Sequence, residues 1–155
     1  MVKRVLLVCL GNICRSPAAE GVLRQKSAER GIKLTIDSAG TGAWHEGSSP
    51  DDRMQHAAKR RGYDLSKQKA RAVELADFYS FDYLLAMDMR NHSDLLSMAP
   101  PNRECDIRLF LDFAEGPEQE TPDPYYGGEA GFDHVLDLVE RGVEGFLDHV
   151  ENEGG

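Results

Sequence analysis

The hydrophobic pattern predicts strands and helices that alternate along the chain. A continuous apolar run at 5–8 indicates a strand buried on both faces, and such strands belong to parallel sheets. Pro17 then favours the first turn of a helix, and Gly31 can end that helix. Further strands are predicted at 33–39, 81–87 and 106–111, and further helices at 49–61, 91–98 and 132–150.

This alternation predicts an α/β fold: a single-domain, doubly wound sheet of four parallel strands, flanked by helices on both faces. The length of 155 residues fits one domain over 1–155, with 151–155 as a frayed tail. Ligands of such sheets bind beyond the carboxyl ends of the strands. Residues 9–16 follow the first strand directly, so we expect a phosphate-binding loop there.

Composition and charge narrow the range of partners. The net charge of −9 means that the protein repels nucleic acid and anionic membrane surfaces, so neither is expected as a partner. No segment approaches the roughly 18 consecutive apolar residues of a membrane span. The chain has three cysteines, an odd number, and opens without a secretory signal. These features favour a reducing, cytoplasmic location.

The segment VCLGNICRSPAAEG, residues 8–21, contains the main candidates for reactive and ligand-binding side chains. A zinc site is disfavoured, because it needs about four ligands and Cys9 and Cys14 have no further cysteine or histidine pair at ligand spacing. A buried structural cysteine is the ordinary alternative for Cys9. The third interpretation is an oxyanion pocket, in which Gly11 and Asn12 permit unusual backbone dihedrals and successive N–H groups turn inward.

In such a pocket, Arg15 offers a planar fork that matches two phosphate oxygens. The sulfur of Cys9 must be ionised to attack, whereas an ordinary cysteine thiol is mostly protonated at neutral pH. A helix terminus contributes only about 0.3–1 kcal/mol toward an anion, so Arg15 and the loop N–H groups must supply most of the stabilisation. Ser16 can donate a hydrogen bond to this sulfur, or cap the helix that starts at Pro17.

At VCLGNICRSP the sequence closely resembles the low-molecular-weight protein tyrosine phosphatases. Further matching segments follow in the family's order: DSAGTGAWHEG at 37–47, MDMRN at 87–91 and TPDPYYGG at 121–128. The similarity spans essentially the whole chain. It implies hydrolysis of phosphotyrosine in proteins and of small aryl phosphates, with inorganic phosphate as product and inhibitor, in a monomer or weak dimer. It implies no metal and no organic cofactor.

The resemblance also implies the roles of the site residues. Cys9 is the nucleophile that forms a phosphocysteine, Arg15 binds the phosphate, and Asp123 is the general acid. The phosphate-binding loop comprises Leu10, Gly11, Asn12, Ile13, Cys14, Arg15 and Ser16. From the residues themselves, Pro122 and Pro124 stiffen the loop around Asp123, although an ordinary proline-rich surface turn has the same composition.

Asn12 and Ser38 match family positions whose side chains brace the phosphate loop, while Asp88 has either a supporting role or a helix-capping one. Cys14 matches a second loop cysteine that can form a reversible disulfide with the nucleophile.

The resemblance implies that aromatic residues in polar loops line a deep slot for the tyrosyl ring, with Ile13 at its base. They are Trp44, Tyr125 and Tyr126. Plain loop packing is the alternative for each of them. Ile13 also favours phosphotyrosine, because related protein-arginine phosphatases carry threonine at this position.

Two rival functions remain. A thiol-dependent arsenate reductase shares the fold but relays oxidation through two further cysteines, and Cys105 has no neighbour for that relay. A silent phosphopeptide-binding module has no use for a nucleophile together with an acid. The five histidines show neither metal-ligand nor nucleophile spacing.

Overall fold

The computed structural model describes residues 2–125 and 127–154 and contains one four-stranded sheet. Its strands are β1 (Lys3–Cys9), β2 (Leu34–Gly40), β3 (Tyr83–Ala86) and β4 (Asp106–Leu109). They are all parallel, in the order β2-β1-β3-β4. The predicted sheet of four parallel strands is therefore confirmed, and β1 lies in its interior with Cys9 opposite Gly40 of β2.

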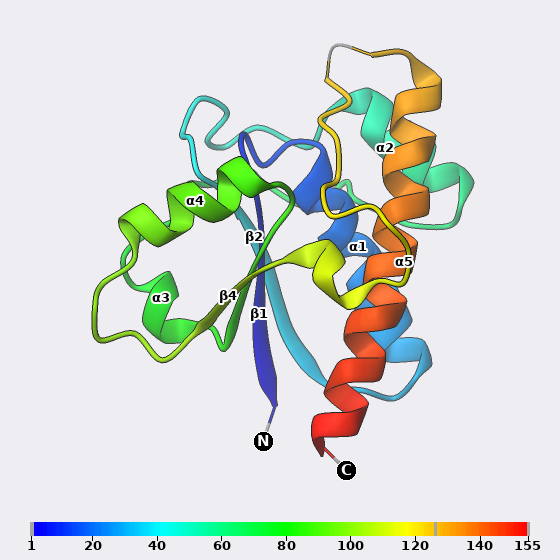
Figure 1. Ribbon diagram of the computed structural model, residues 1–155. Helices are drawn as coiled ribbons and strands as arrows, with labels where there is room; N and C mark the ends of the chain where they lie inside the picture. The colour runs from blue at the N-terminus through cyan, green and yellow to red at the C-terminus, as the bar shows by residue number, and fades with distance from the viewer. Residues whose placement is uncertain (1, 126, 155) are drawn as a thin grey trace.

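Helices cover both faces of this sheet (Figure 1). They are α1 (Arg15–Glu29), α2 (Asp52–Arg60), α3 (Asp77–Ser80), α4 (Met89–Met98) and α5 (Glu129–Gly154), with a short 3₁₀ helix, η1 (Phe110–Phe113). In Figure 1, α1, α2 and α5 lie on one side of the strands, and α3 and α4 lie on the other. The doubly wound architecture predicted from the sequence is confirmed.

Strand β1 contributes to two separate hydrophobic clusters, one on each face. Val5 and Leu7 belong to the cluster on the side of α1 and α5, while Leu6 and Val8 pack with Leu95 of α4 on the other side. Successive side chains of a strand point to opposite faces, so a strand covered on both sides must be apolar throughout. This explains the uninterrupted apolar run at 5–8.

Helix α1 begins earlier than the sequence pattern indicated. It starts at Arg15, with Cys14 as N-cap residue and no side-chain cap, so Pro17 is its third residue rather than its first. Proline is tolerated there because the first four N–H groups of a helix have no intrahelical partner. Ser16 is therefore inside the helix, and its proposed role as an N-cap is wrong.

The chain after β4 also differs from the prediction. The strand stops at Leu109, and residues 110–113 turn into η1, where Phe110 and Leu111 remain buried. A buried strand and a buried 3₁₀ turn both require apolar side chains at these positions. The apolar pattern at 106–111 therefore could not distinguish a strand from a 3₁₀ turn.

The end of the chain is helical where the sequence suggested a frayed tail. Helix α5 continues to Gly154. Glu151 accepts a hydrogen bond of 2.6 Å from Arg30 after α1, and Glu153 accepts one from the hydroxyl of Tyr83 in β3. These contacts hold the last turns against the rest of the molecule.

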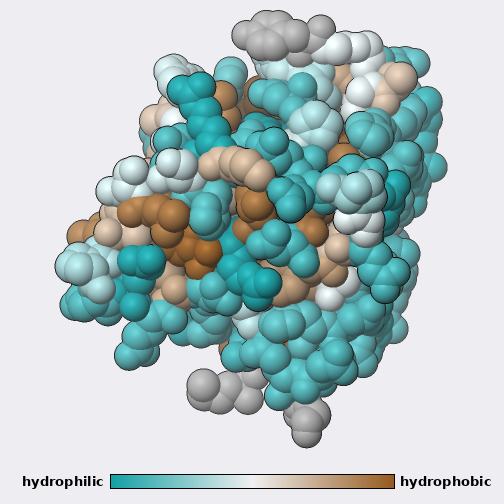
Figure 2. All heavy atoms as spheres, viewed as in Figure 1, coloured by the Kyte–Doolittle hydropathy of each residue, from teal (hydrophilic) through white to brown (hydrophobic). Residues whose placement is uncertain are grey.

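Hydrophilic residues cover most of the face that Figure 2 presents, with apolar residues gathered in its middle. Among residues 2–125 and 127–154, no helix combines the length and the apolar character needed to cross a membrane.

Candidate active site

The segment between β1 and α1 curls back over the sulfur of Cys9. Asn12 adopts a φ of 57°, in the left-handed region that asparagine tolerates better than most residues. Its backbone N–H lies 3.3 Å from Cys9 Sγ and donates to it. Gly40, beside this segment, permits a close approach, because a Cβ there would lie 2.7 Å from the carbonyl oxygen of Leu10.

A second donor reaches the same sulfur from α1. Ser16 Oγ lies 3.0 Å from Cys9 Sγ, and this oxygen accepts a hydrogen bond of 2.8 Å from Asn12 Nδ2. The amide occupies one lone pair of the hydroxyl, and the hydroxyl proton is free to point toward the sulfur. The sulfur of Cys9 thus has a backbone N–H and a hydroxyl as its hydrogen-bond partners.

Asn12 is the centre of a buried polar network beneath the loop. Its Nδ2 also donates to Ser38 Oγ at 3.0 Å, and its Oδ1 accepts from the backbone N–H of Arg71 at 3.0 Å. Ser38 in turn donates to Glu20 Oε1 at 2.6 Å. Asn12 and Ser38 were candidates from the sequence, but Glu20 and Arg71 were missed, since a carboxylate on a helix resembles any solvent-facing residue.

Arg15 is almost fully buried, with 3% of its surface exposed. Its Nη1 donates to Asp88 Oδ2 at 2.7 Å and to the carbonyl of Thr121 at 3.0 Å, while its Nη2 lies 3.9 Å from Asp123 Oδ2. Burial opposes the charge of the guanidinium, but Cys9 and Asp88 outweigh it and raise the pKa of Arg15. A fixed positive charge therefore lies beside the sulfur.

Asp88 bonds both to the first turn of α4 and to Arg15. Its Oδ1 accepts from the backbone N–H of Asn91 at 2.7 Å and caps α4, while its other oxygen pairs with Arg15. The helix cap thus holds the carboxylate that orients the guanidinium.

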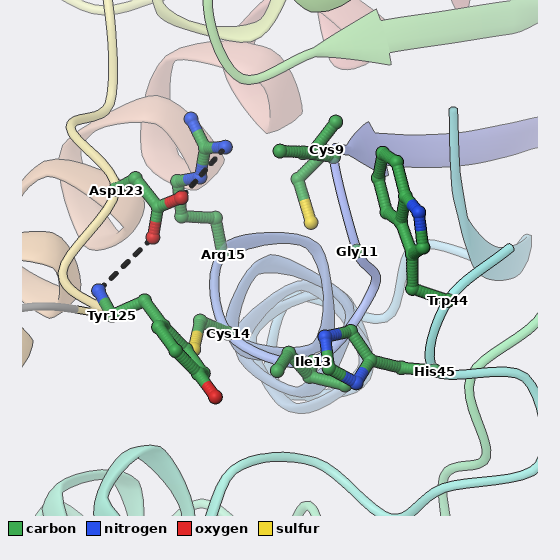
Figure 3. Close-up of a pocket in the computed structure, with 10 residues that line it drawn as sticks. Cys9, Gly11, Ile13, Cys14, Arg15, Trp44, His45, Asp123 and Tyr125 are labelled. Carbon is green, nitrogen blue, oxygen red and sulfur yellow. Dashed lines mark hydrogen bonds and ion pairs between the residues drawn. The ribbon is translucent and has the colours of Figure 1, made fainter. Parts of the chain in front are cut away.

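Asp123 lies on the loop between η1 and α5, and 44% of its side chain is exposed. Its Oδ1 accepts from the backbone N–H of Tyr125 at 3.0 Å, as in an Asx turn. The preceding anchor is Thr121, whose N–H donates to the carbonyl of Met87, the residue after β3, at 2.7 Å. Figure 3 shows the Asp123 carboxylate turned toward the guanidinium of Arg15.

A cavity of about 430 Å³ opens above the sulfur, with Trp44 and Tyr125 on opposite sides (Figure 3). Its lining comprises Cys9, Leu10, Gly11, Ile13, Cys14, Arg15, Trp44, His45, Asp123 and Tyr125. Asn12 and Ser16 are not part of this lining, since their side chains belong to the buried network. Trp44 is 73% exposed, so it forms an edge of the cavity rather than a packed wall.

For two residues, the lining of the cavity differs from the sequence prediction or lies beyond it. Tyr126, expected in the slot, lies outside the described residues. His45 was missed, because the five histidines showed no informative spacing; only the folded loop places its ring against Gly11, where a Cβ would lie 2.9 Å from His45 Cδ2.

Cys14 is buried beside the cavity, and all three cysteines are free thiols. Burial, followed by the nearby carboxylate of Asp51, raises the pKa of Cys14. Its thiol is therefore neutral at physiological pH. Over residues 2–125 and 127–154, no group of three or more histidine, cysteine, aspartate or glutamate side chains is arranged to hold a metal ion.

Residues 4–154 match the family model of the low molecular weight phosphotyrosine protein phosphatases. The chain belongs to this family. The low molecular weight protein-tyrosine-phosphatase YfkJ of Bacillus subtilis is 41% identical over 152 residues, which cover 96% of each chain. Membership makes the protein a cysteine-dependent protein tyrosine phosphatase, a hydrolase, and does not favour an arsenate reductase.

Solved structures of similar chains agree with this phosphatase fold. A protein tyrosine phosphatase from Entamoeba histolytica, crystallised with Hepes in its active site, is 41% identical with a TM-score of 0.94, over 99% of both chains. The drosophila arginine phosphatase DARP is 35% identical with a TM-score of 0.90, over 94% of this chain and 96% of that one. The architecture is therefore shared by phosphatases named for two different phosphorylated residues.

Proposed function

We propose that this phosphatase hydrolyses phosphotyrosine through Cys9, Arg15 and Asp123. The observation that carries the proposal is their convergence on one cavity: a sulfur that receives two hydrogen bonds, a buried guanidinium, and a half-exposed carboxylate 3.9 Å from that guanidinium. A nucleophile, a phosphate-binding charge and a proton donor are the three groups that transfer of a phosphoryl group to sulfur requires.

In the first step, the Cys9 thiolate attacks phosphorus in line with the ester bond. The S–P bond forms, the bond between phosphorus and the phenolic oxygen breaks, and protonated Asp123 gives its proton to the leaving phenolate. Charge on the equatorial oxygens is met by the loop N–H groups and by Arg15.

In the second step, the ionised Asp123 takes a proton from water as the water oxygen bonds to phosphorus. The S–P bond breaks and restores the thiolate, which the hydrogen bonds from Ser16 and Asn12 make a better leaving group. Inorganic phosphate is the product, and it competes with substrate because it fits the same loop.

The substrate class follows from the cavity walls. Trp44 and Tyr125 flank the opening, and Ile13 lines it, so an aromatic ring attached to the phosphate finds apolar contacts. Because the chain is similar to an arginine phosphatase, phosphotyrosine and phosphoarginine are the two substrate classes to compare. We favour phosphotyrosine, since Ile13 offers no hydroxyl to a guanidino group.

Further features of the proposal concern regulation and surroundings. Cys14 is proposed as the partner that forms a disulfide with an oxidised Cys9. Free thiols support a reducing cytoplasm as the working compartment. We also propose a monomer or weak dimer in solution.

The test is an assay with an aryl phosphate series on the native protein, Cys9→Ser and Asp123→Ala. Cys9→Ser should abolish turnover. Asp123→Ala should lower kcat/KM by about 10²–10⁴ for substrates with poor leaving groups and far less for good ones. Activity retained by Cys9→Ser, or an Asp123→Ala loss that is independent of the leaving group, would overturn the proposal. A parallel assay with phosphoarginine tests the substrate class.

A further inference from the structure

In the loop that carries Asp123, the described residues 114–125 and 127–128 form no helix or strand. On its N-terminal side, Thr121 is fixed by the backbone of Met87 and by Arg15. On its other side, the Asp123 carboxylate depends on the backbone N–H of Tyr125, from which it accepts a hydrogen bond. The position of Tyr125, together with the ion pair to Arg15, therefore fixes where this carboxylate points.

Arg53, in the first turn of α2, holds Tyr125. Its Nη2 donates to the carbonyl oxygen of Tyr125 at 2.9 Å, and its guanidinium lies 5.4 Å from the centre of the Tyr125 ring. The same guanidinium lies 4.8 Å from the ring centre of Phe132 in α5. Arg53 thus contacts both Tyr125 and the helix α5 that follows the loop.

Arg53 is itself oriented by the phosphate loop. Asp51 accepts two hydrogen bonds from the Arg53 side chain, at 3.1 and 2.9 Å. The backbone N–H of Asp51 donates to the carbonyl oxygen of Ile13 at 2.8 Å. A continuous series of contacts therefore runs from the phosphate loop through Asp51, Arg53 and Tyr125 to Asp123.

This arrangement is poorly suited to a purely stabilising role. The side chain of Arg53 is 47% exposed, and exposed ion pairs contribute little to folding. The planar fork, however, contacts Asp51 on one side and a backbone carbonyl on the other, which is a geometry that lysine cannot reproduce. Arg53 therefore orients the loop in addition to making a small contribution to stability.

We propose that Arg53 is a positioning residue for the general acid, which it acts on through the backbone of Tyr125. The inference rests on the proposed function of Asp123. Arg53 does not line the cavity above the sulfur, so its loss should impair protonation of the leaving group while phosphate binding in the loop is retained.

The experiment compares Arg53→Ala and Arg53→Lys with Arg60→Ala. Arg60 is a matched control, because it lies in the same helix, is 48% exposed and pairs with Asp133 at 3.3 Å. We expect Arg53→Ala to lower kcat/KM about tenfold for phenyl phosphate and less than about twofold for 2,4-dinitrophenyl phosphate. Arg53→Lys should recover only part of the loss, and Arg60→Ala should match the native protein.

Two further measurements distinguish positioning from direct binding or altered folding. The inhibition constant of inorganic phosphate should change less than about twofold in Arg53→Ala, because Arg15 and the loop are intact. In an Asp123→Ala background, Arg53→Ala should cost nothing more, since the group it positions is absent.

An equal loss for every leaving group, weaker phosphate inhibition, or a full effect in the Asp123→Ala background would overturn the inference. Failure of Cys9→Ser and Asp123→Ala to impair turnover would instead overturn the proposed function. If both impair turnover as expected and the Arg53 variants do not, only the positioning role is refuted.

Discussion

The phosphate loop and the acid loop flank one cavity but are held in opposite ways. In the phosphate loop, Asn12 and Ser16 are buried and linked by side-chain hydrogen bonds to each other and to the neighbouring strand. In the acid loop, Asp123 is half exposed, and the contacts that hold it involve backbone atoms of Thr121 and Tyr125.

The difference corresponds to what each loop must do. An anion that persists through the catalytic cycle is best stabilised by donors that are already oriented, which a buried and fully bonded network provides. A proton donor must exchange its proton with the leaving group and then with water, so it needs access to both. The phosphate loop is therefore rigid, whereas the acid loop leaves its carboxylate accessible to the leaving group and to water. Contacts from α2 restrict the movement of the acid loop.

The largest expected effect on stability comes from the phosphate loop. Asn12→Gly keeps the left-handed backbone but removes three side-chain hydrogen bonds, so we expect a loss of about 2–4 kcal/mol in the free energy of unfolding measured with urea. Asn12→Ala should cost about 1–2 kcal/mol more, because alanine is strained at this φ.

Asp123→Ala is the matched change in the acid loop. Its side chain is half exposed, so the free energy of unfolding should change by less than about 0.5 kcal/mol. Equal losses at Asn12 and Asp123 would remove the distinction between the two loops.

A second prediction concerns the sulfur. Ser16→Ala removes one of the two hydrogen bonds to Cys9, and we expect alkylation of Cys9 by iodoacetamide at pH 6 to slow about tenfold. Ser27→Ala is the control, since Ser27 is also buried in α1 but donates to the carbonyl of Arg24. Equal rates for the Ser16 variant and the native protein would show that this hydroxyl does not favour the thiolate.

The smallest expected effect tests the link between α2 and the acid loop. Hydrogen bonds from the Arg53 side chain lower the pKa of Asp51, so this pairing stabilises the fold above the ordinary aspartate pKa of about 3.9 and is lost as pH falls through the lowered value. Asp51→Asn keeps the cap of α2 but removes the charge. Its Tm should lie about 1–3 °C below that of the native protein at pH 7.

The pH dependence of this difference is the decisive readout. The two Tm values should converge as pH falls through the lowered pKa of Asp51, where the native side chain also loses its charge. The Tm of Asp51→Ala, which also removes the cap of α2, should lie below that of Asp51→Asn both at pH 7 and in acid. A Tm difference that persists in acid would assign the effect to the cap rather than to the ion pair.

Much of the fold could be predicted from local pattern. The apolar run of β1 and the alternation of strands with helices indicate a parallel sheet, because only a strand covered on both faces lacks polar positions. Element ends were less predictable. Burial of Phe110 and Leu111 is compatible with strand or 3₁₀ turn, and nothing local indicates that α1 begins at Arg15.

What the sequence determined by itself is the chemistry of residues 9–16, since a sulfur, a glycine–asparagine turn and an arginine within one loop are close in space whatever surrounds them. Only the tertiary structure decided that Asp88, Thr121 and Asp123 meet at Arg15, and that Glu20 and Arg53 support the two loops. The physical reason is that parallel strands bring their carboxyl ends to one edge of the sheet, where residues distant in sequence become neighbours. The identity of a polar residue on a helix does not indicate which distant residue it will contact.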